Sequence, residues 1–407
     1  MTKADKEGQR KAPILRFKGF TDDWEQRKLQ NQVQFFSGLT YSPNDVKDVG
    51  TFVIRSSNIK DNTLVSADNV YVNPNIANSE PVKKDDVIMV VRNGSKSLIG
   101  KHALVTRKID NTVIGAFMTG IRSSTPYFLD ALLDTLNFKK EIYKNLGATI
   151  NQITIGNLRK MTFKVPNESE KFKIGNLFKK LNYLLALYDR KLKLLSQVKK
   201  YFLDNLFAEK EYPNLRFKYF KKDKWEKTSL NSIVTYSNGK AHEKEINNKG
   251  NLDLVMMNSI TTGGRLITKK KILSPQDTLN KNDIVIVLSD IAKGELIGKS
   301  SVIPCDNQYV LNQRIGCLHP TLNIDSFFVS KYINQKNRYF KSHAAGTSQI
   351  NLSKSDVLNC TIYIPKVDEQ HCVSNFIINV EKIINFYEYK KRHIIQIKNI
   401  LLNTMFI

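Results

Sequence analysis

Two stretches of the sequence have residue types found in catalytic or cofactor-binding motifs, but neither has the required spacing. Gly294–Ser300 resembles a phosphate-binding loop, yet it is one residue shorter than G-x-x-x-x-G-K-S, and a strand-like segment follows it. Glu388–Lys390 resembles the end of a nuclease motif, but it lies in a helical pattern without a convincing acidic pair upstream. The histidines lack metal-ligand spacing, and the sequence has neither a glycine-rich cofactor loop nor an Asn/Asp-Pro-Pro-aromatic motif of an amino-methyltransferase. We therefore expect no catalytic residue, no metal site and no cofactor in this chain.

The charge balance points instead to binding of a polyanion. The chain has 63 Lys and Arg residues against 38 Asp and Glu, a formal net charge of +25, which exceeds what solubility requires. Nucleic acid is the commonest partner of such a protein, and an acidic membrane surface is the alternative. The basic residues are spread through strand-and-loop segments as well as helical ones, without a compact basic amphipathic anchor. Nucleic acid is therefore the favoured partner.

The composition is that of a folded, soluble protein. A length of 407 residues suggests two or three domains, and a hydrophobic content of 41% is ample for buried cores. The first eleven residues lack the apolar core of a signal peptide, and the longest apolar run near the start, Val87–Val91, is too short to cross a bilayer. We expect a cytoplasmic protein with a flexible tail over residues 1–12. The four cysteines form no C-x-x-C pair and are expected to be free, buried thiols.

The stretch 167–207 has the apolar period of one long helix. Apolar residues recur every seven positions in two adjacent rows, with charged residues between them. The first row comprises Ile174, Leu181, Tyr188, Leu195 and Phe202, and the second comprises Phe178, Leu185, Leu192 and Leu206, interrupted by Lys199. A helix of about forty residues spans roughly 60 Å and exceeds the usual globular length, so its apolar seam needs a partner.

That partner is predicted 199 residues later in the same chain. The rows recur there as Val373, Val380, Tyr387, Ile394 and Leu401, and as Ile377, Ile384 and Met405, interrupted by Lys391 and Lys398. Both stretches follow a strand-like segment that ends in proline. Both also end on a matching pair of residues, Leu203 and Phe207 in one and Leu402 and Phe406 in the other. This shared register indicates an internal duplication rather than two unrelated amphipathic helices.

The duplication continues upstream through a series of matching landmarks. Each copy opens with Leu-Arg-Phe-Lys, which precedes one of the only two tryptophans, Trp24 and Trp225. A Lys/Asp turn then leads into an apolar strand (84–91 and 281–288), and a shared Leu-Ile-Gly-Lys follows (98–101 and 296–299). Each copy continues with a helical run (127–145 and 326–342) and a Gly/Ser/Thr segment (147–149 and 346–348). The loops between the landmarks differ in length and chemistry. This pattern indicates one scaffold used twice with two different binding surfaces.

In their order and repetition, these landmarks resemble the specificity subunit of bacterial type I restriction–modification enzymes, the HsdS family. The resemblance runs from about Pro13 to the end of the sequence. It implies an α+β fold with two mixed α/β target recognition domains, separated by two long antiparallel helices that form a coiled-coil spacer, in a pseudo-twofold internal repeat. The corresponding boundaries are 13–166 and 209–365 for the two recognition domains, and 167–208 and 366–407 for the two helices.

The resemblance also implies function and partners. Each recognition domain would read one half of a bipartite double-stranded DNA target, and the helices would dock two methyltransferase subunits, which restriction subunits then join. The subunit itself would have no catalytic activity, and S-adenosylmethionine, ATP and magnesium would bind only to its partners. Two alternatives stay open: a stand-alone enzyme that modifies nucleic acid, and the specificity subunit of a related bipartite restriction system.

DNA contacts are predicted in the loops that differ between the two copies. Lys and Arg are expected to meet phosphates, while Arg, Asn and Gln can reach base edges. In the first domain the candidates are Thr40, Arg92, Asn93, Ser95, Lys96, Lys101, Thr119 and Arg122. In the second domain they are Lys240, Ser289, Asp290, Lys293, Lys299, Asn312, Gln313 and Arg314. Lys101 and Lys299 occur in both copies, which favours a scaffold role for them.

Overall fold

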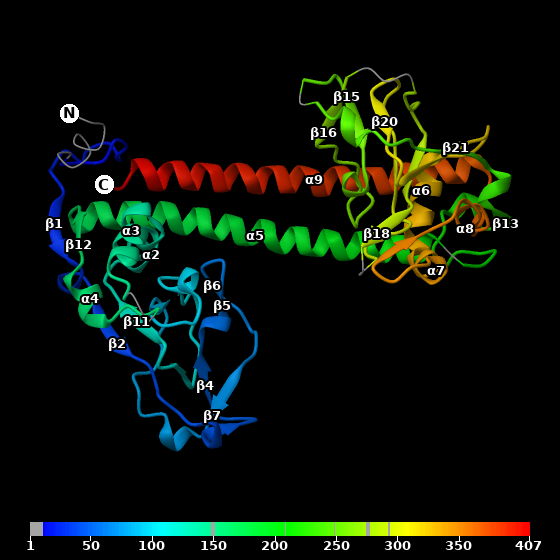
Figure 1. The fold of residues 1–407 in the computed structure, drawn as a ribbon. Coiled ribbons are helices and arrows are strands. Elements are labelled where there is room, and N and C mark those ends of the chain that lie inside the picture. Colours follow the sequence, from blue (N-terminus) through cyan, green and yellow to red (C-terminus); the bar gives the residue numbers. More distant parts are fainter. Residues whose placement is uncertain (1–10, 148–150, 208, 248, 274–276, 292–293) are drawn as a thin grey trace. The chain divides into compact units, whose positions relative to one another are not determined.

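The computed structural model describes residues 11–147, 151–207, 209–247, 249–273, 277–291 and 294–407. They form two compact units, of which unit 1 comprises Met1–Arg190 with Glu388–Ile407 and unit 2 comprises Lys191–Tyr387. Two long helices, α5 (Glu168–Leu206) and α9 (Val367–Thr404), each contribute one part to either unit (Figure 1). Each unit thus holds one mixed α/β domain and one pair of helix segments. Within the described residues, no helix is long and apolar enough to span a membrane.

Within the described residues, the domain of unit 1 contains two four-stranded sheets, a two-stranded ribbon, a short hairpin of β5 (Ile59–Lys60) and β6 (Thr63–Leu64), and three short α-helices. The first sheet is antiparallel, in the order β2 (Gln34–Ser37), β11 (Met118–Arg122), β8 (Val87–Val90) and β9 (His102–Leu104). The second has the order β10 (Thr112–Ile114), β4 (Thr51–Ile54), β7 (Val70–Val72) and β3 (Val46–Lys47), with a parallel pair between β10 and β4. The ribbon pairs β1 (Glu25–Lys28) with β12 (Thr162–Val165), and the helices are α2 (Pro126–Asp134), α3 (Leu136–Lys144) and α4 (Ile155–Lys160).

The domain of unit 2 repeats this plan. Its main sheet has the order β14 (Val234–Asn238), β21 (Ile315–Pro320), β17 (Ile284–Val287) and β19 (Ser300–Val302). Its second sheet has the order β16 (Lys270–Ile272), β15 (Leu252–Val255) and β20 (Tyr309–Leu311), again with one parallel pair. The ribbon pairs β13 (Glu226–Ser229) with β23 (Thr361–Ile364), an added pair joins β18 (Ser289–Ile291) to β22 (Gln349–Asn351), and the helices are α6 (Ser326–Gln335), α7 (Asn337–His343) and α8 (Lys354–Leu358). The shared strand order confirms the predicted internal repeat.

The repeated Lys/Asp turn starts the central strand of each main sheet. Asp85 and Asn282 occupy equivalent positions with φ of 73° and 71°, a left-handed conformation that Asp and Asn tolerate better than most residues. The next residue, Asp86 or Asp283, accepts a hydrogen bond from the backbone N–H three positions earlier. The strand that follows, β8 or β17, is buried along its whole length, which explains its continuous apolar sequence.

The burial pattern of α5 and α9 confirms the predicted seam. The apolar residues of both rows are buried or half-buried, whereas most residues between the rows are exposed. Phe178 packs on Phe406 in unit 1, and Phe202 packs on Phe376 in unit 2 at a centroid distance of 4.6 Å. A second pair in each unit, Asp189 with Lys391 in unit 1 and Lys199 with Glu381 in unit 2, shows that the residue number in α9 falls as that in α5 rises. The two helix segments therefore run antiparallel within each unit.

The lysines that interrupt the apolar rows all have acidic partners. Lys199 lies 2.6 Å from the carboxylate of Glu381 in unit 2, and Lys391 pairs with Asp189 in unit 1. Lys398, the repeat equivalent of Lys199, donates to Asp134 at the end of α2 over 2.8 Å. These pairs compensate the desolvation of cations in an apolar seam, and Lys398 also fastens α2 to α9.

A buried glutamate near the start of each long helix binds the opening segment of its domain. In unit 1, Glu170 accepts hydrogen bonds from Arg16 at 2.9 and 2.7 Å and from the indole of Trp24 at 3.2 Å. In unit 2, Glu369 receives the matching bonds from Arg216 at 2.7 and 2.6 Å and from Trp225 at 3.1 Å. The glutamate side chains are 0% and 2% exposed. The duplicated Arg and Trp of the sequence are therefore parts of one structural lock.

The end of each long helix completes the core of a domain. In unit 1, Phe406 packs against Trp24 and Phe128, and the backbone N–H of Leu15 donates to the carbonyl of Thr404. In unit 2, Phe207 packs against Phe328, and the N–H of Leu215 donates to the carbonyl of Asn205. The end of α9 thus has the role in unit 1 that the end of α5 has in unit 2.

The cysteines are free, as expected, but only half of them are buried. Cys317 and Cys360 are buried, Cys305 is partly accessible and Cys372 is exposed on α9. Burial of all four was therefore a wrong prediction, because position 372 lies outside the apolar rows of the helix.

We predict that Glu170→Gln destabilises unit 1 by about 3–5 kcal/mol, because it leaves the guanidinium of Arg16 buried without a counter-charge. The free energy of unfolding from urea titration measures the effect. The matched control is Glu25→Gln, whose carboxylate pairs with Arg27 at an exposed site, so its loss is expected to cost less than about 1 kcal/mol. Equal losses for the two variants would contradict the assigned role of the buried glutamate.

Candidate nucleic-acid interface

One tight backbone crossing brings the predicted binding loops together in each domain. In unit 1 the loop after β2 forms a parallel bridge between Leu39 and Gly115, and in unit 2 the loop after β14 forms one between Lys240 and Asn312. A Cβ atom on Gly38 would lie 2.0 Å from the carbonyl oxygen of Gly115, and one on Gly239 would lie 2.1 Å from that of Asn312. Only glycine fits at either crossing. Each crossing places a variable loop beside the turn that enters the central β11 or β21 strand.

In unit 2 this edge gathers four of the predicted residues. Lys240 is exposed and lies 2.5 Å from Asp277. Asn312, Gln313 and Arg314 form the adjacent turn, in which Asn312 is buried while Gln313 and Arg314 are exposed. The carboxylate of Glu243 accepts hydrogen bonds from the amides of Asn312 at 3.2 Å and Gln313 at 3.1 Å. The structure thus forms a compact polar cluster from segments that lie about seventy residues apart.

In unit 1 the equivalent edge has different chemistry. Phe117, which takes the place of Arg314, is 53% exposed, and the guanidinium of Arg92 lies over its ring at 4.9 Å. Asn93 donates to the hydroxyl of Ser56 at 3.1 Å. Thr40 is exposed in the crossing loop. The first domain therefore presents an aromatic ring with a stacked cation where the second presents amides and a carboxylate.

Two further candidates of unit 1 lie at the exposed tip of the loop after β8. The hydroxyl of Ser95 lies 2.9 Å from that of Ser97, and Lys96 begins a 3₁₀ turn, Lys96–Leu98. Lys96 is exposed, so its ammonium group is accessible to a phosphate. Both residues belong to the same variable loop as Arg92 and Asn93.

Several predicted residues instead support the framework. Thr119 is fully buried and donates to the carbonyl of Phe36 at 3.2 Å. Arg122 forms a two-pronged ion pair with Asp86 at 2.7 and 2.9 Å and a third bond to Glu80 at 2.9 Å. The side chain of Ser289 bonds to Asn351 and the carboxylate of Asp290 accepts from the backbone of Leu296 at 2.6 Å; both residues are buried. In this conformation these four side chains have their hydrogen-bonding groups engaged within the domains.

The shared lysines also lie close to the framework. Lys101 and Lys299 are half-buried, and Lys299 donates to the carbonyl of Asn334 at 3.3 Å. Burial lowers the pKa of Lys299, and the nearby charge of Lys341 lowers it further. Lys293, the remaining candidate, lies outside the residues that the structure describes.

Sequence reasoning missed Phe117 and Glu243. An exposed aromatic residue beside the glycine of a turn could have indicated the first, but the amino-acid pattern alone does not separate it from a core phenylalanine. Glu243 lies three positions after Lys240, and a negative side chain is not an obvious candidate for a contact with DNA. Only the fold shows that Phe117 lies at the turn into β11 and that Glu243 contacts the turn into β21.

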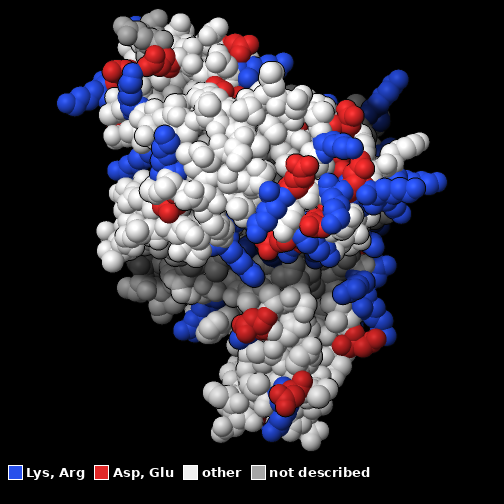
Figure 2. Space-filling model, turned by 90° about the vertical axis from the view of Figure 1, so that its right-hand side faces the viewer, with Lys and Arg blue, Asp and Glu red and all other residues white. Residues whose placement is uncertain are grey.

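The basic residues do not form a single patch on the face shown in Figure 2. Lys and Arg side chains stand in several groups there, with Asp and Glu side chains between them and uncharged surface over the rest. The basic residues visible on this face are therefore distributed rather than gathered in one dense patch.

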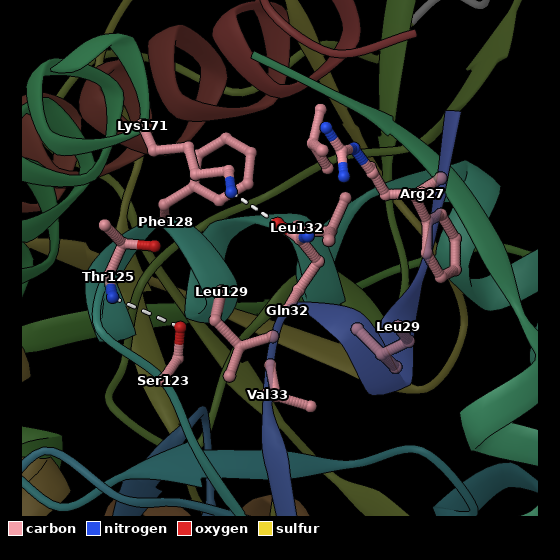
Figure 3. A pocket seen from close by; sticks show the side chains of 12 residues that line it. Arg27, Leu29, Gln32, Val33, Ser123, Thr125, Phe128, Leu129, Leu132 and Lys171 are labelled. Atoms are coloured by element: carbon pink, nitrogen blue, oxygen red, sulfur yellow. Dashed lines mark hydrogen bonds between the residues drawn. The ribbon is translucent and has the colours of Figure 1, made fainter. Parts of the chain in front are cut away.

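A small cavity in unit 1 is a packing void rather than a ligand site. It lies among Leu29, Val33, Phe128 and Leu129, with the ammonium of Lys171 bonded to Gln32 at its side (Figure 3). Its volume of about 20 Å³ has room for roughly one water molecule. A nucleotide cannot enter a space of this size.

Three potential metal ligands meet in unit 2 at Asp283, Cys317 and His319. His319 Nδ1 lies 2.7 Å from a carboxylate oxygen of Asp283, its Nε2 lies 2.8 Å from the hydroxyl of Ser237, and burial raises the pKa of the Cys317 thiol. Asp283 and His319 are equivalent to Asp86 and Arg122 of unit 1, which form an ion pair. The contact between Asp283 and His319 is therefore explained as a version of that ion pair whose cation can lose its proton. The hydrogen bond to Asp283 raises the pKa of His319.

The raised pKa of His319 predicts a pH-dependent stability of unit 2. Protonated imidazole is favoured in the folded state, so this contribution is complete below the unfolded-state pKa of about 6.5 and is lost as pH rises through the higher folded-state value. Urea midpoints measured between pH 6 and pH 9 should fall more for the parent protein than for His319→Arg, which copies the permanently charged pair of unit 1. Identical pH profiles for the two proteins would contradict the proposed titration.

Two copies of one α/β framework, with different side chains at the turn into β11 and at the turn into β21, define a protein built by internal duplication. A family model described as the type I restriction modification DNA specificity domain matches the sequence twice, at residues 21–197 and 222–399. The chain therefore belongs to the family of the type I restriction modification DNA specificity domain, and DNA sequence specificity is its role. The resemblance inferred from the duplicated motifs is thereby confirmed.

Similar proteins span nearly the same length. The specificity subunit of the type I restriction enzyme MjaVIII from Methanocaldococcus jannaschii is 20% identical over 81% of this chain and 80% of its own. That of StySPI from Salmonella potsdam is 22% identical over 86% of this chain and 80% of its own. The crystal structure of a type I restriction–modification S subunit from M. genitalium shares the fold with a TM-score of 0.66, at 13% identity over 97% of this chain and 99% of that one. A chain of a second type I restriction–modification structure matches with a TM-score of 0.53, at 15% identity over 93% of this chain and 96% of that one.

Proposed function

We propose that the two domains, residues 13–166 and 209–365, each read one half of a bipartite DNA target and thereby direct methyltransferase and restriction subunits to it. The observation that carries this proposal is the repeated strand order with unlike residues at the same turn. Phe117 with Arg92 in one domain and Gln313 with Arg314 in the other would contact different bases. One framework with two different edges suits a target whose halves differ in sequence.

The long helices, within residues 167–208 and 366–407, act in this proposal as a spacer and as the docking surface for two methyltransferase subunits. Each unit has a set of exposed apolar residues on its helix pair. The sets are Leu184, Leu187, Ile397 and Ile400 in unit 1, and Ile383, Phe386, Val198 and Tyr201 in unit 2. Members of one set are the repeat equivalents of the other.

The position of these sets supports two equivalent docking sites. In both helices, each of these residues lies one position before a residue of one of the two rows, counting the lysines that interrupt them. Because the helix segments run antiparallel, that offset places each set on one side of its helix pair. Exposed apolar residues gathered in this way are a feature of protein interaction sites. Two copies of one partner subunit would therefore find two similar surfaces.

The chemistry in this proposal belongs to the partners. The subunit acts in the cytoplasm without catalytic residues of its own, and S-adenosylmethionine, ATP and magnesium bind to the methyltransferase and restriction subunits. The residues gathered at the two edges support this division, since they are suited to hydrogen bonding with bases and phosphates. Methylation assays with and without a methyltransferase subunit distinguish this role from that of a stand-alone enzyme.

Base-specific and phosphate contacts are predicted to respond differently to substitution. In a complex co-expressed with its methyltransferase subunit, Arg314→Ala should relax base preference in the second half-site only, at a cost of about 1–3 kcal/mol in discrimination. Lys96→Ala is the control, since loss of a phosphate contact weakens binding to all sequences and lowers the salt dependence. Mapping of methylated adenines reads out the first effect and salt-dependent binding the second. A change in the first half-site with Arg314→Ala would reverse the assignment of the domains.

Docking is tested by placing charge in one of the two apolar sets. Leu187→Asp with Ile400→Asp should reduce the bound methyltransferase copies from two to one, because desolvating a carboxylate in an apolar contact is unfavourable. Native mass spectrometry of the assembled complex measures the copy number. Ala186→Asp, at an exposed position of α5 outside both sets, serves as the control. Retention of two copies in the double variant would place the docking surface elsewhere.

A further inference from the structure

We infer that Glu243 determines base specificity in the second domain by selecting a base with an exocyclic amino group, adenine or cytosine, over one with a keto group. The inference rests on the proposed function, because it assumes that the turn at Asn312–Arg314 faces DNA. It goes beyond that function by assigning a residue and the chemical class of base that the residue reads.

The geometry fixes the orientation of the amides at this edge. Oε1 of Glu243 accepts from Nδ2 of Asn312 at 3.2 Å and from Nε2 of Gln313 at 3.1 Å, and Oδ1 of Asn312 accepts from the backbone N–H of Gln313 at 2.6 Å. With its amino group held by the carboxylate, Gln313 turns its carbonyl oxygen away from Glu243. Both Glu243 and Gln313 are exposed, so the carbonyl oxygen of Gln313 and the remaining lone pairs of the carboxylate are the acceptors that this cluster can offer to a base.

The carboxylate is ionised at neutral pH. A hydrogen bond from its own backbone N–H lowers the pKa of Glu243, and the two amides and the positive charge of Arg314 lower it further. Such a group accepts hydrogen bonds and cannot donate them. In the major groove, adenine N6 and cytosine N4 are donors, whereas guanine O6 and thymine O4 are acceptors. Glu243 is thus complementary to the amino bases and repels the keto bases.

A carboxylate at a DNA-binding edge opposes the attraction of phosphate, so it calls for a specific role. Other acidic residues on the corresponding 3₁₀ turns of the two domains have local partners that account for them. Glu245, on the same 3₁₀ turn, lies 2.8 Å from His242, and in unit 1 Asp45 caps its own turn through bonds to Ser42 at 2.7 and 2.8 Å. Glu243 instead reaches across to the turn that contains three of the predicted DNA contacts. This difference separates it from acids that stabilise a loop.

The test compares Glu243→Gln with Glu245→Gln in the complex with the methyltransferase subunit. Both variants remove one negative charge from the turn Glu243–Glu245, so any general gain in DNA attraction is the same. The measurement is the initial methylation rate on a duplex library with a randomised second half-site. At one position, the parent complex should prefer adenine or cytosine over guanine or thymine by about tenfold or more, as expected for a specific base contact.

Glu243→Gln should reduce that preference at least about fivefold and leave the first half-site unchanged, while Glu245→Gln should retain the parent preference. Glu243→Asp keeps the charge but shortens the reach to the amides, and it should also lose the preference. A parent preference that survives in Glu243→Gln would overturn the inference and leave the proposed function intact. Failure of the parent complex to recognise any split target would instead overturn the proposed function. Thermal midpoints within about 2 °C of the parent are expected, since Glu243 is exposed.

Discussion

A buried carboxylate at the start of each long helix is the constraint on which both domains depend. Glu170 and Glu369 are enclosed by protein, so each requires a counter-charge, and the guanidinium of Arg16 or Arg216 provides it with two parallel hydrogen bonds. The same carboxylate binds the indole of the following tryptophan. One side chain thus joins helix, opening segment and domain core. This explains why the Arg and the Trp of the opening segment occur in both copies.

The framework tolerates different chemistry at equivalent positions, provided that the charge is balanced. The ion pair of Arg122 with Asp86 in one domain is replaced by His319 with Asp283 in the other. Both acids still accept a backbone hydrogen bond in the turn before β8 or β17. At the binding edge the substitutions are freer, since Phe117 and Arg314 occupy the same place. At the hydrogen-bonded pair within the framework, residues are replaced only by residues of similar charge. Residues beside the backbone crossing differ in both size and charge.

Helical period and repetition predicted most of the fold, because seven-residue spacing and a shared register survive without knowledge of the partner surface. The helical runs at 127–145 and 326–342 are each divided in the structure; in the first, the hydroxyl of Thr135 accepts from Phe138 N–H and starts a second helix. The candidate site was harder to predict. Burial of Thr119 and the ion pair of Arg122 depend on strands distant in sequence, and the approach of Glu243 to Gln313 depends on the crossing of two loops. Residue type alone does not show whether a polar side chain is hydrogen-bonded within its domain or available to bind DNA.

The packing of Leu402, Met405 and Phe406 in the core of unit 1 has a consequence for synthesis of the protein. Unit 2 is one continuous stretch of chain, so all its parts have left the ribosome once Tyr387 has emerged. Unit 1, although most of it is made before unit 2, lacks part of its core until residues 388–407 have been translated. The amino-terminal part of unit 1 must therefore wait for residues 388–407, and a stop codon before them would damage the domain that is made earlier.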